Sequence, residues 1–451
     1  MRRATVRPQP RTREPFPIMN TPIATPTTAG SPLDTAAIVE TASALIAMHP
    51  VYDSAGQRHA MDYLEQRMRA LGASIRRCRI YDEEIEKHPC YVHVENFGGP
   101  FAGYRETVRE NLVCELDFGE PGPTVLLNGH VDVEFVTAPE QWSKPEGWRK
   151  PRVEDGLLYG RGSSDMLGAV ACFVAVAEAL SRAKAEGARL GGRLLLHFVV
   201  DEEIGGNGTL ATLSTLDGKV DAALIGEPTD GAVCTRTRSF EQFKVVCGGR
   251  PRHMCLSDGS ANALSQAVRV FTILEELDQW CRDQLGGDPV RSLCAGVLRG
   301  GSDAAVPAAS AELLVTAALP PSLTFDAVIA ELEARLRAAF PDAEPPQVAP
   351  YGLRFPASQE GHEGLAAGLR VELEGIAKVD AARREARDFP SACDARIFES
   401  FSIPTVIYGP GSLARAHGPD EYVSLDELSV YTKVVHQTLR AAFSGDTELS
   451  R

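Results

Sequence analysis

Short apolar runs alternate with helical patterns over the first half of this chain, from about residue 34 to residue 235. The runs at 123–130, 192–203 and 220–228 have the length and apolar content of buried strands, and 168–187 has a helical pattern. Strands that are separated by helices usually run parallel and are covered on both faces. We therefore expect an α/β fold with a largely parallel sheet.

The order of elements changes after residue 236. A strand pattern is followed by a helix at 261–285, two more strand patterns and a second helix at 323–340. This β-α-β-β-α order is typical of a small two-layer α+β unit. The first helix is expected to pack through Leu264, Val268, Phe271, Leu274 and Leu277. We predict a disordered arm at 1–31, a main α/β domain in two parts at 32–236 and 348–451, and an inserted domain at 237–347.

The charge of the chain limits its partners. The formal net charge is -15 at pH 7, and the acidic residues form no block. Such a surface repels nucleic acids and anionic membranes, and no apolar run reaches the ~20 residues that span a bilayer. The N-terminal arm lacks the apolar core of a secretory signal, and the ten cysteines include no C-x-x-C pair. We therefore expect a cytoplasmic protein with reduced thiols and a small-molecule substrate.

Polar side chains recur where the predicted strands end. Each lies just after a strand pattern, in a tight turn before a helix, or in the loop that follows the last strand pattern. The residues are His130, Asp132, Asp165, Asp201, Glu202, Glu203, Glu227 and His417. In open α/β sheets the ligand site lies outside the carboxyl ends of the strands. These side chains are therefore expected to meet in one cleft.

Two histidines and several carboxylates form a ligand set that suits zinc, cobalt or manganese. Two metal ions roughly 3.5–4 Å apart need a carboxylate between them, and Asp165 is the candidate bridge. His130 and Glu227 could complete the shell of one ion. Glu203 and His417 could complete the shell of the other.

Two further residues suit catalysis at such a centre. Residues two apart in an extended segment face the same side, so Asp132 can orient the ring of His130. Glu202 faces differently from Glu203, so it can accept the proton of a water held between the metals and pass it to a leaving nitrogen. The pattern indicates a two-metal hydrolase that cleaves an amide bond.

Each residue taken alone also has a simpler explanation. Asp165 could cap the helix that follows, the acidic run at 201–203 could be a solvated surface, and His417 could be a surface histidine. Their joint placement at strand ends is difficult to explain in this way, so we favour the metal site.

Five motifs resemble the family of acetylornithine deacetylase, succinyl-diaminopimelate desuccinylase, aminoacylase and carboxypeptidase G. They are LLNGHVDV (126–133), GLLYGRGSSDM (156–166), VVDEEIGGNGT (199–209), IGEPTD (225–230) and VIYGPGSLARAHGPDEYV (406–423). The resemblance covers nearly the whole chain from about residue 34. It implies a zinc-exopeptidase-like three-layer catalytic domain with an inserted ferredoxin-like lid and dimerisation domain. It also implies a cis peptide bond between Asp165 and Met166.

The resemblance implies the same division of roles. It identifies the ligands of two divalent ions, with zinc favoured, as His130, Asp165, Glu203, Glu227 and His417. Glu202 resembles the general acid and base, and Asp132 the partner of His130. In the family, a histidine of the lid enters the active site of the neighbouring subunit of a homodimer. His253 is the candidate for that role, with a surface histidine as the alternative.

The chain departs from the family pattern where substrate is held. Leu167 replaces the usual lysine of the DMKG motif, and the segment 300–321 lacks the usual asparagine and the arginine that grips a substrate carboxylate. Acetylornithine and succinyl-diaminopimelate are therefore in doubt as substrates. An anionic group could be bound instead by one of Arg236, Arg238, Arg250, Arg252 and Arg299. The stretch 86–106 matches no motif and is a candidate for shaping a particular pocket.

Three functions stay open from the sequence. The leading one is an N-acyl amino acid deacylase of the acetylornithine deacetylase type, which uses a metal-bridged water activated by Glu202. A dipeptidase or carboxypeptidase on the same scaffold is the nearest alternative. A non-catalytic binding protein that kept the fold is the third.

Overall fold

The computed structural model describes residues 33–97, 101, 103–256, 262–358, 361–376 and 387–446. The predicted arm at 1–31 lies outside the described residues. Among them, no helix has the length and apolar content needed to cross a membrane.

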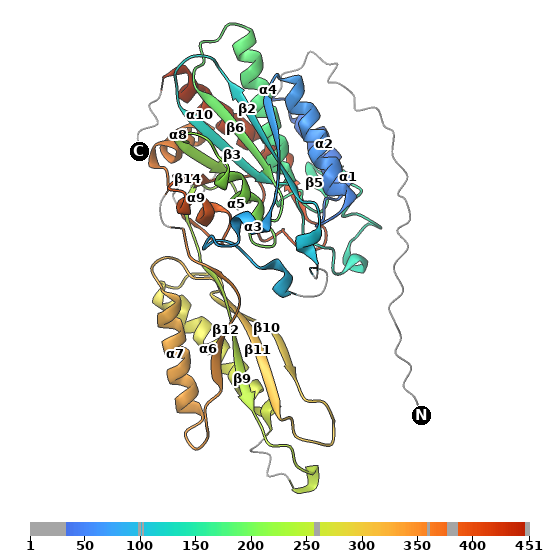
Figure 1. Ribbon diagram of the computed structural model, residues 1–451, viewed down its shortest axis with the longest axis vertical. Coiled ribbons are helices and arrows are strands. Elements are labelled where there is room, and N and C mark those ends of the chain that lie inside the picture. The colour runs from blue at the N-terminus through green and yellow to red at the C-terminus, as the bar shows by residue number, and fades with distance from the viewer. Residues whose placement is uncertain are drawn as a thin grey trace. The chain divides into compact units, whose positions relative to one another are not determined.

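An eight-stranded sheet forms the centre of the main domain (Figure 1). Its strand order is β1-β2-β6-β3-β7-β14-β8-β13. The strands are β1 (Ser74–Arg79), β2 (Glu110–Asp117), β3 (Thr124–His130), β6 (Arg193–Val199), β7 (Ala222–Ile225), β8 (Cys234–Thr237), β13 (Arg387–Phe389) and β14 (Thr405–Ile407). β3 pairs in parallel with β6 and β7, and β7 pairs in parallel with β14. The predicted parallel α/β sheet is therefore confirmed, with the antiparallel pair β1 and β2 added at one edge.

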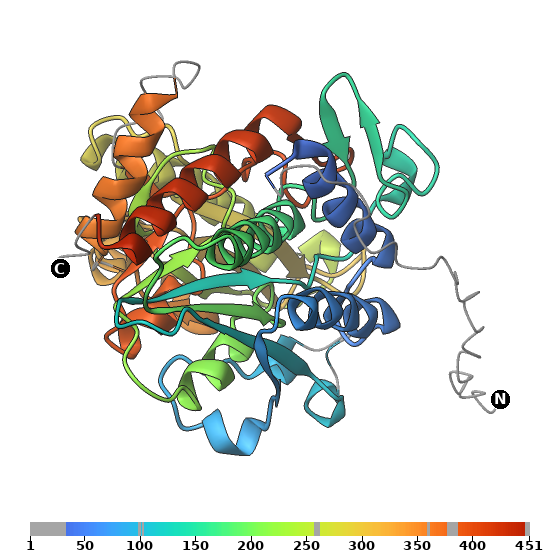
Figure 2. The same ribbon diagram turned by 90° about the horizontal axis from the view of Figure 1, so that it is seen from above.

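Helices cover both faces of this sheet (Figure 2). One layer contains α1 (Thr35–Met48), α2 (Ala55–Ala70), α4 (Leu167–Ala185), α8 (Glu363–Gly375) and α10 (Leu425–Ser444). The other contains α3 (Asp82–Ile85), α5 (Asn207–Ser214) and α9 (Ala395–Ser400). Because it is covered on both faces, β3 is buried at every position, which is why its apolar residues Val125, Leu126 and Leu127 are consecutive rather than alternating.

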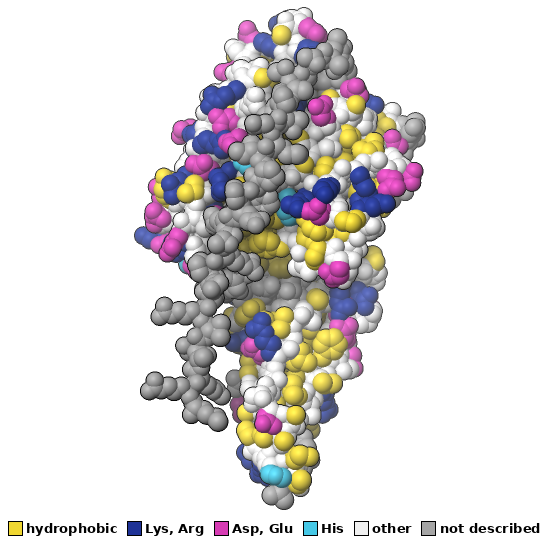
Figure 3. Space-filling model, turned by 90° about the vertical axis from the view of Figure 1, so that its right-hand side faces the viewer, with side chains coloured by type: hydrophobic (Ala, Val, Ile, Leu, Met, Phe, Trp, Pro, Cys, Tyr) yellow, Lys and Arg dark blue, Asp and Glu magenta, His cyan; other side chains and the backbone are white. Residues whose placement is uncertain are grey.

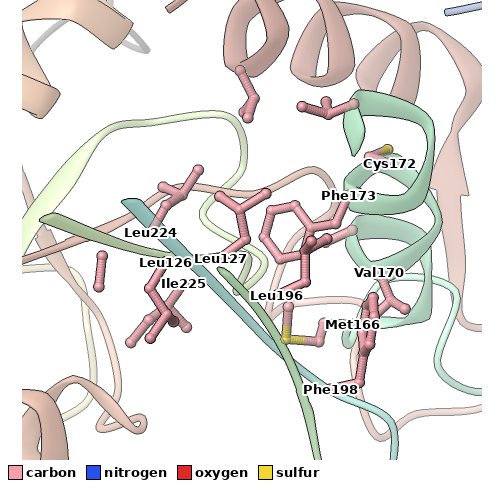
Figure 4. Close-up of a cluster of buried hydrophobic side chains, with 14 of the residues drawn as sticks. Leu126, Leu127, Met166, Val170, Cys172, Phe173, Leu196, Phe198, Leu224 and Ile225 are labelled. Atoms are coloured by element: carbon pink, nitrogen blue, oxygen red, sulfur yellow. The ribbon is translucent and has the colours of Figure 1, made fainter. Parts of the chain in front are cut away.

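Helix α4 packs directly on the centre of the sheet. Phe173 and Val170 of α4 lie against Leu127 of β3 and Leu196 of β6 (Figure 4). Gly129 allows this close approach, because a Cβ atom there would lie 3.0 Å from the Val170 side chain. The segment just before α4 is thereby held at the carboxyl end of β3.

Short elements complete the main domain. The 3-10 turns are η1 (Val94–Phe97), η3 (Tyr104–Glu106) and η4 (Pro139–Gln141). A small antiparallel sheet has the order β15-β5-β4, with β4 (Arg152–Glu154), β5 (Leu157–Tyr159) and β15 (Tyr422–Ser424). The pairing of β15 with β5 brings the segment after His417 next to the turn that contains Asp165.

A separate antiparallel sheet, in the order β10-β11-β9-β12, forms the predicted α+β unit with two helices packed beside it. The elements are β9 (Phe240–Gly248), η5 (Met254–Leu256), α6 (Ala263–Gln284), β10 (Leu293–Gly300), β11 (Ser310–Ala317), α7 (Phe325–Ala339) and β12 (Gln347–Phe355). This unit has its own core, which includes Val245, Leu313 and Leu332. The boundaries at 237 and 347 stay a prediction, and since β12 pairs with β9 we propose that the inserted domain ends at Phe355.

The predicted inner face of the first inserted helix is wrong in part. In α6, Val268 is 60% exposed and Phe271 is 41% exposed. The buried face instead contains Ala267, Val270 and Leu274. The helix has apolar residues on more than one face, and local periodicity cannot tell which face the sheet covers.

All ten cysteines are free thiols, and seven of them are buried. Burial raises the pKa of the Cys114 and Cys172 thiols to about 12, which leaves them protonated and unreactive near neutral pH.

Candidate metal centre

The structure brings the five predicted metal ligands together at the carboxyl edge of the central sheet. They form two groups that share Asp165, and within each group one ligand atom per residue lies within 4.8 Å of the others. The groups are His130, Asp165 and Glu227, and Asp165, Glu203 and His417.

The first group is buried. His130 is the last residue of β3, and its Nε2 atom lies 3.1 Å from Asp165 Oδ1 and 3.9 Å from Glu227 Oε1. Glu227 follows β7, the strand beside β3. Parallel pairing therefore places both residues at the same edge of the sheet.

The second group opens toward solvent. Nε2 of His417 lies 2.9 Å from Glu203 Oε2 and 3.3 Å from Asp165 Oδ2, and the His417 side chain is 49% exposed. Asp165 thus faces each histidine with a different oxygen, which is the arrangement that a bridging carboxylate needs.

The residues present fit a pair of divalent cations. Glu203 Oε1 and Glu227 Oε1 are buried and have no hydrogen-bond partner among the described residues. A buried carboxylate oxygen without a partner is costly, and a cation would satisfy it. Imidazole and carboxylate ligands are those that zinc, cobalt and manganese accept.

The electrostatics of the cluster agree with this fit. Burial raises the pKa of Glu227 well above its usual range, and the charge of Asp165 adds to the effect. Burial alone would lower the pKa of His130, but its hydrogen bond with Asp165 and the charge of Glu227 raise it well above the usual value. The cluster therefore holds an excess of negative charge that attracts either protons or cations.

Glu202 lies between Asp201 and the ligand candidate Glu203, directly after β6. Burial raises the pKa of the Glu202 carboxyl well above its usual range, and the charge of Glu227 contributes further. A buried carboxyl group with a raised pKa is suited to proton transfer.

The position of Asp132 differs in detail from the expectation. Nδ1 of His130 lies 2.9 Å from the backbone carbonyl oxygen of Asp132, but 3.9 Å from the nearer carboxylate oxygen. The carbonyl oxygen is thus the closer acceptor, and a proton on Nδ1 leaves Nε2 free to bind a metal. The Asp132 carboxylate instead accepts a hydrogen bond from the backbone N–H of Glu203 at 3.2 Å.

Sequence reasoning missed one buried ion pair that holds the centre. Glu421 Oε1 accepts hydrogen bonds from the backbone N–H groups of Ser164 and Asp165, at 3.0 and 3.2 Å. Its other oxygen pairs with Arg161 Nη1 at 2.7 Å, and Arg161 Nη2 donates to the carbonyl oxygen of His417 at 2.9 Å. Both residues lie within the matched motifs, but no local spacing connects them. The Asp165–Met166 bond is cis, as the resemblance implied.

A second buried network holds the loop that carries the acidic run. Arg109 is 1% exposed, and its Nη1 lies 2.8 Å from Asp201 Oδ2. Its Nη2 pairs with Asp82, and Tyr91 donates to the other oxygen of Asp82 at 2.8 Å. Asp201 therefore supports the loop and belongs to neither group of candidate ligands.

Among the described residues, no recorded contact joins His253 to the candidate metal ligands. It is exposed, and its Nδ1 accepts a hydrogen bond from the backbone N–H of Cys255 at 3.3 Å. Its proposed entry into a neighbouring active site stays a prediction. Leu167 is buried at the start of α4.

Two of the five candidate arginines have close carboxylate partners. Arg238 pairs with Asp288, and Arg236 lies 2.7 Å from Asp388. The other three, Arg250, Arg252 and Arg299, are exposed.

Comparisons with known proteins agree with this geometry. The sequence model of peptidase family M20/M25/M40 matches residues 126–441. An N-formyl-4-amino-5-aminomethyl-2-methylpyrimidine deformylase of Bacillus subtilis is 29% identical over 69% of this chain and 78% of its own length. An N-acetyl-L-citrulline deacetylase of Xanthomonas campestris is 28% identical over 71% of this chain and 82% of its own.

Solved structures share the fold. Human carnosine dipeptidase 1 superimposes with a TM-score of 0.67 at 15% identity, over 92% of this chain and 97% of that one. A tripeptidase of Staphylococcus aureus gives a TM-score of 0.65 at 18% identity, over 91% and 98%.

Proposed function

Because the chain belongs to peptidase family M20/M25/M40, and so is a metal-dependent hydrolase of amide or peptide bonds, we propose that it removes a short acyl group from an N-acyl amino acid or a related N-acyl amine. The observation that carries this proposal is the pair of ligand groups that share Asp165. A two-metal centre of this kind suits amide hydrolysis, in which water attacks the carbonyl carbon and an amine leaves.

Two of the relatives support deacylation. By their names, the Bacillus and Xanthomonas relatives remove a formyl group and an acetyl group, and each aligns with about 70% of this chain. The dipeptidase and tripeptidase neighbours are at most 18% identical, so their likeness supports the fold alone. A dipeptidase or carboxypeptidase activity is therefore the alternative that the test must exclude.

We assign the chemistry to two divalent ions, with zinc favoured. His130 and Glu227 would hold one ion, Glu203 and His417 would hold the other, and Asp165 would serve both. When bound, the ions lower the pKa of a water molecule and polarise the scissile carbonyl. Glu202 would accept the proton of the attacking water on its carboxylate and deliver it to the leaving nitrogen. All these residues are present, which argues against a non-catalytic binding protein.

The exposed surface of the inserted domain supports a homodimer. Val268 and Phe271 of α6 and Leu298 of the edge strand β10 are large, apolar and exposed. Hydrophobic side chains are visible on the side of this domain that Figure 3 shows. An edge strand beside exposed apolar side chains is typical of a surface that pairs with a second copy. In such a dimer, His253 would donate a hydrogen bond to the oxyanion that forms in the partner's site.

The test is a substrate panel with the metal-loaded full-length protein. It should include N-formyl, N-acetyl and N-succinyl derivatives of amines and amino acids, together with dipeptides. We expect turnover of at least one formyl or acetyl compound, and none when Glu202→Gln replaces the wild-type protein. Hydrolysis of dipeptides without any deacylation would instead make the protein a peptidase.

A further inference from the structure

One turn of the chain carries both the candidate general base and a candidate metal ligand. This turn, 201–206, follows β6 and includes Glu202 and Glu203, and we call it the acidic turn. Its backbone is unusual, because Asp201 has a φ of 68° and Gly205 a φ of 119°, values that residues other than glycine rarely adopt. The backbone N–H of Gly205 closes the turn on the carbonyl oxygen of Glu202 at 2.9 Å. A turn of this kind persists only where the surrounding structure holds it.

The acidic turn has separate supports for its three acidic residues. Asp201 is held through its carboxylate by the buried Arg109, at 2.8 Å. The backbone N–H of Glu203 donates a hydrogen bond to the Asp132 carboxylate at 3.2 Å. Glu202 is held through its backbone carbonyl, by the glycine that closes the turn. A contact that fixes this glycine therefore acts on Glu202 more than on its two acidic neighbours.

Arg396 of α9 makes such a contact. Its Nη2 donates a hydrogen bond to the carbonyl oxygen of Gly205, and its Nη1 donates to the carbonyl oxygen of Cys90 at 3.1 Å. The residue is 6% exposed, and burial lowers the pKa of its guanidinium, while the charges of Asp394 and Glu202 raise it. A buried guanidinium costs desolvation free energy, so its hydrogen bonds are weak evidence for a purely stabilising role. Gly205 joins Arg396 to Glu202, because its carbonyl accepts from one and its N–H donates to the other.

The stretch of the sequence that matched no motif packs against the end of the acidic turn. The backbone N–H of Val92 donates to Asn207 Oδ1 at 3.0 Å, and Asn207 Nδ2 donates to the carbonyl oxygen of Val92 at 2.8 Å. A Cβ atom at Gly205 would lie 2.6 Å from Cγ2 of Val92, so no larger residue fits there. Phe355 of β12 lies with its ring centroid 3.8 Å from Cζ of Arg396, which adds a cation–π contact. The guanidinium therefore joins three distant segments at the turn.

We propose that Arg396 is a positioning residue for the reaction, which fixes the acidic turn so that the Glu202 carboxylate is directed at the attacking water. It acts through the backbone of Gly205 rather than on the substrate. The inference rests on the proposed role of Glu202 as the general base. Because Asp201 and Glu203 keep their own supports when Arg396 is replaced, the loss should fall on turnover and leave the metal ions bound.

The experiment is a double-mutant cycle of Arg396→Met and Glu202→Asp in the metal-loaded full-length protein, on the substrate of the panel that it hydrolyses fastest. Methionine fills space but donates no hydrogen bond. We expect Arg396→Met to lower kcat about 10²-fold, as a displacement of about 1 Å would, with KM and metal content unchanged. Glu202→Asp already displaces the carboxylate by one methylene group, so Arg396→Met should then cost less than about threefold. No loss of kcat, equal losses in both backgrounds, or loss of the metal ions would overturn the inference.

Arg67→Met is the matched control, because Arg67 of α2 is also largely buried but pairs with Glu178 in the helix layer on the opposite face of the sheet. It should lower the free energy of unfolding and leave kcat unchanged, and an equal fall in kcat would count against the inference. Arg396→Lys can donate to only one of the two carbonyl oxygens and should lower kcat about tenfold. It replaces Arg396→Met in the cycle if that variant does not fold. A near-normal kcat in Glu202→Gln would refute the proposed base, whereas equal losses in the two Glu202 backgrounds refute only the role of Arg396.

Discussion

The hydroxyl of Tyr104 donates a hydrogen bond to Asp201 Oδ1 at 2.8 Å. Tyr104 is buried in a small apolar cluster with Tyr52 and Val92, and Asp201 immediately precedes Glu202 and Glu203. One hydrogen bond therefore connects this cluster to the loop that carries the candidate general base and a candidate metal ligand. Arg109 holds the other oxygen of Asp201 at 2.8 Å.

Arg109→Lys tests this support. An ammonium group cannot reach both Asp82 and Asp201 in the way that the guanidinium does, so one buried carboxylate loses its cationic partner and keeps only a tyrosine hydroxyl. We expect the free energy of unfolding to fall by about 3 kcal/mol, near the lower end of the range for breaking a buried ion pair. Urea denaturation measures this, with Arg105→Lys as the matched control, since Arg105 is a partly exposed neighbour. An equal loss in both variants would remove Arg109 from this role.

Glu202→Gln should retain both metal ions and lose turnover. The amide preserves the size of the side chain but cannot accept the proton of the attacking water, and such proton transfer contributes about 10²–10⁴-fold to the rate. Metal content by elemental analysis and kcat on the best substrate of the panel give the result. Near-normal kcat in a variant that holds its metal would exclude Glu202 from the mechanism.

Removal of metal should abolish activity and lower the thermal stability together. The buried carboxylates of Glu203 and Glu227 lose the cations that satisfy them, and a ligand that binds only the folded state stabilises it by mass action. Dialysis against a chelator, a melting curve and a rate measurement test this. Zinc, cobalt and manganese are then added back separately. Full activity in protein proven to be free of metal would refute the proposed centre.

Glu421 and Arg161 should be strongly coupled. Glu421→Gln leaves the buried guanidinium of Arg161 without a charged partner and should destabilise the fold by about 3–5 kcal/mol. The double variant Glu421→Gln, Arg161→Met should recover part of this loss, because the unpaired charge is gone. A double-mutant cycle in urea measures the coupling energy. Additive losses would show that the pair does not act as a unit.

Subunit mixing tests the role of His253 and the dimer. His253→Ala and Glu202→Gln should each be inactive alone, and a random mixture should recover about a quarter of the wild-type activity per site, since half of the dimers are mixed and each has one intact site. Exchange is verified with differently tagged subunits. No recovery despite exchange, or a fully active monomer, would reject a histidine that acts in the partner's site.

The sequence by itself determined the element types and the identity of the clustered residues. Consecutive apolar residues such as Val125, Leu126 and Leu127 predict strands covered on both faces, and polar residues at the ends of parallel strands must meet at one edge. The grouping of His130, Asp165, Glu203, Glu227 and His417 therefore followed from local patterns and the resemblance together.

Only the tertiary structure decided which of several equivalent groups makes each contact. It placed the carbonyl oxygen of Asp132, rather than the carboxylate, nearest to Nδ1 of His130. It also paired Arg161 with Glu421 and buried the Ala267 face of α6 instead of the Val268 face. The physical reason is that these contacts join residues far apart in the chain, or choose between faces that are both apolar. Periodicity reports only which residues share a face, and the packing of distant segments decides which face is buried and which partner each residue meets.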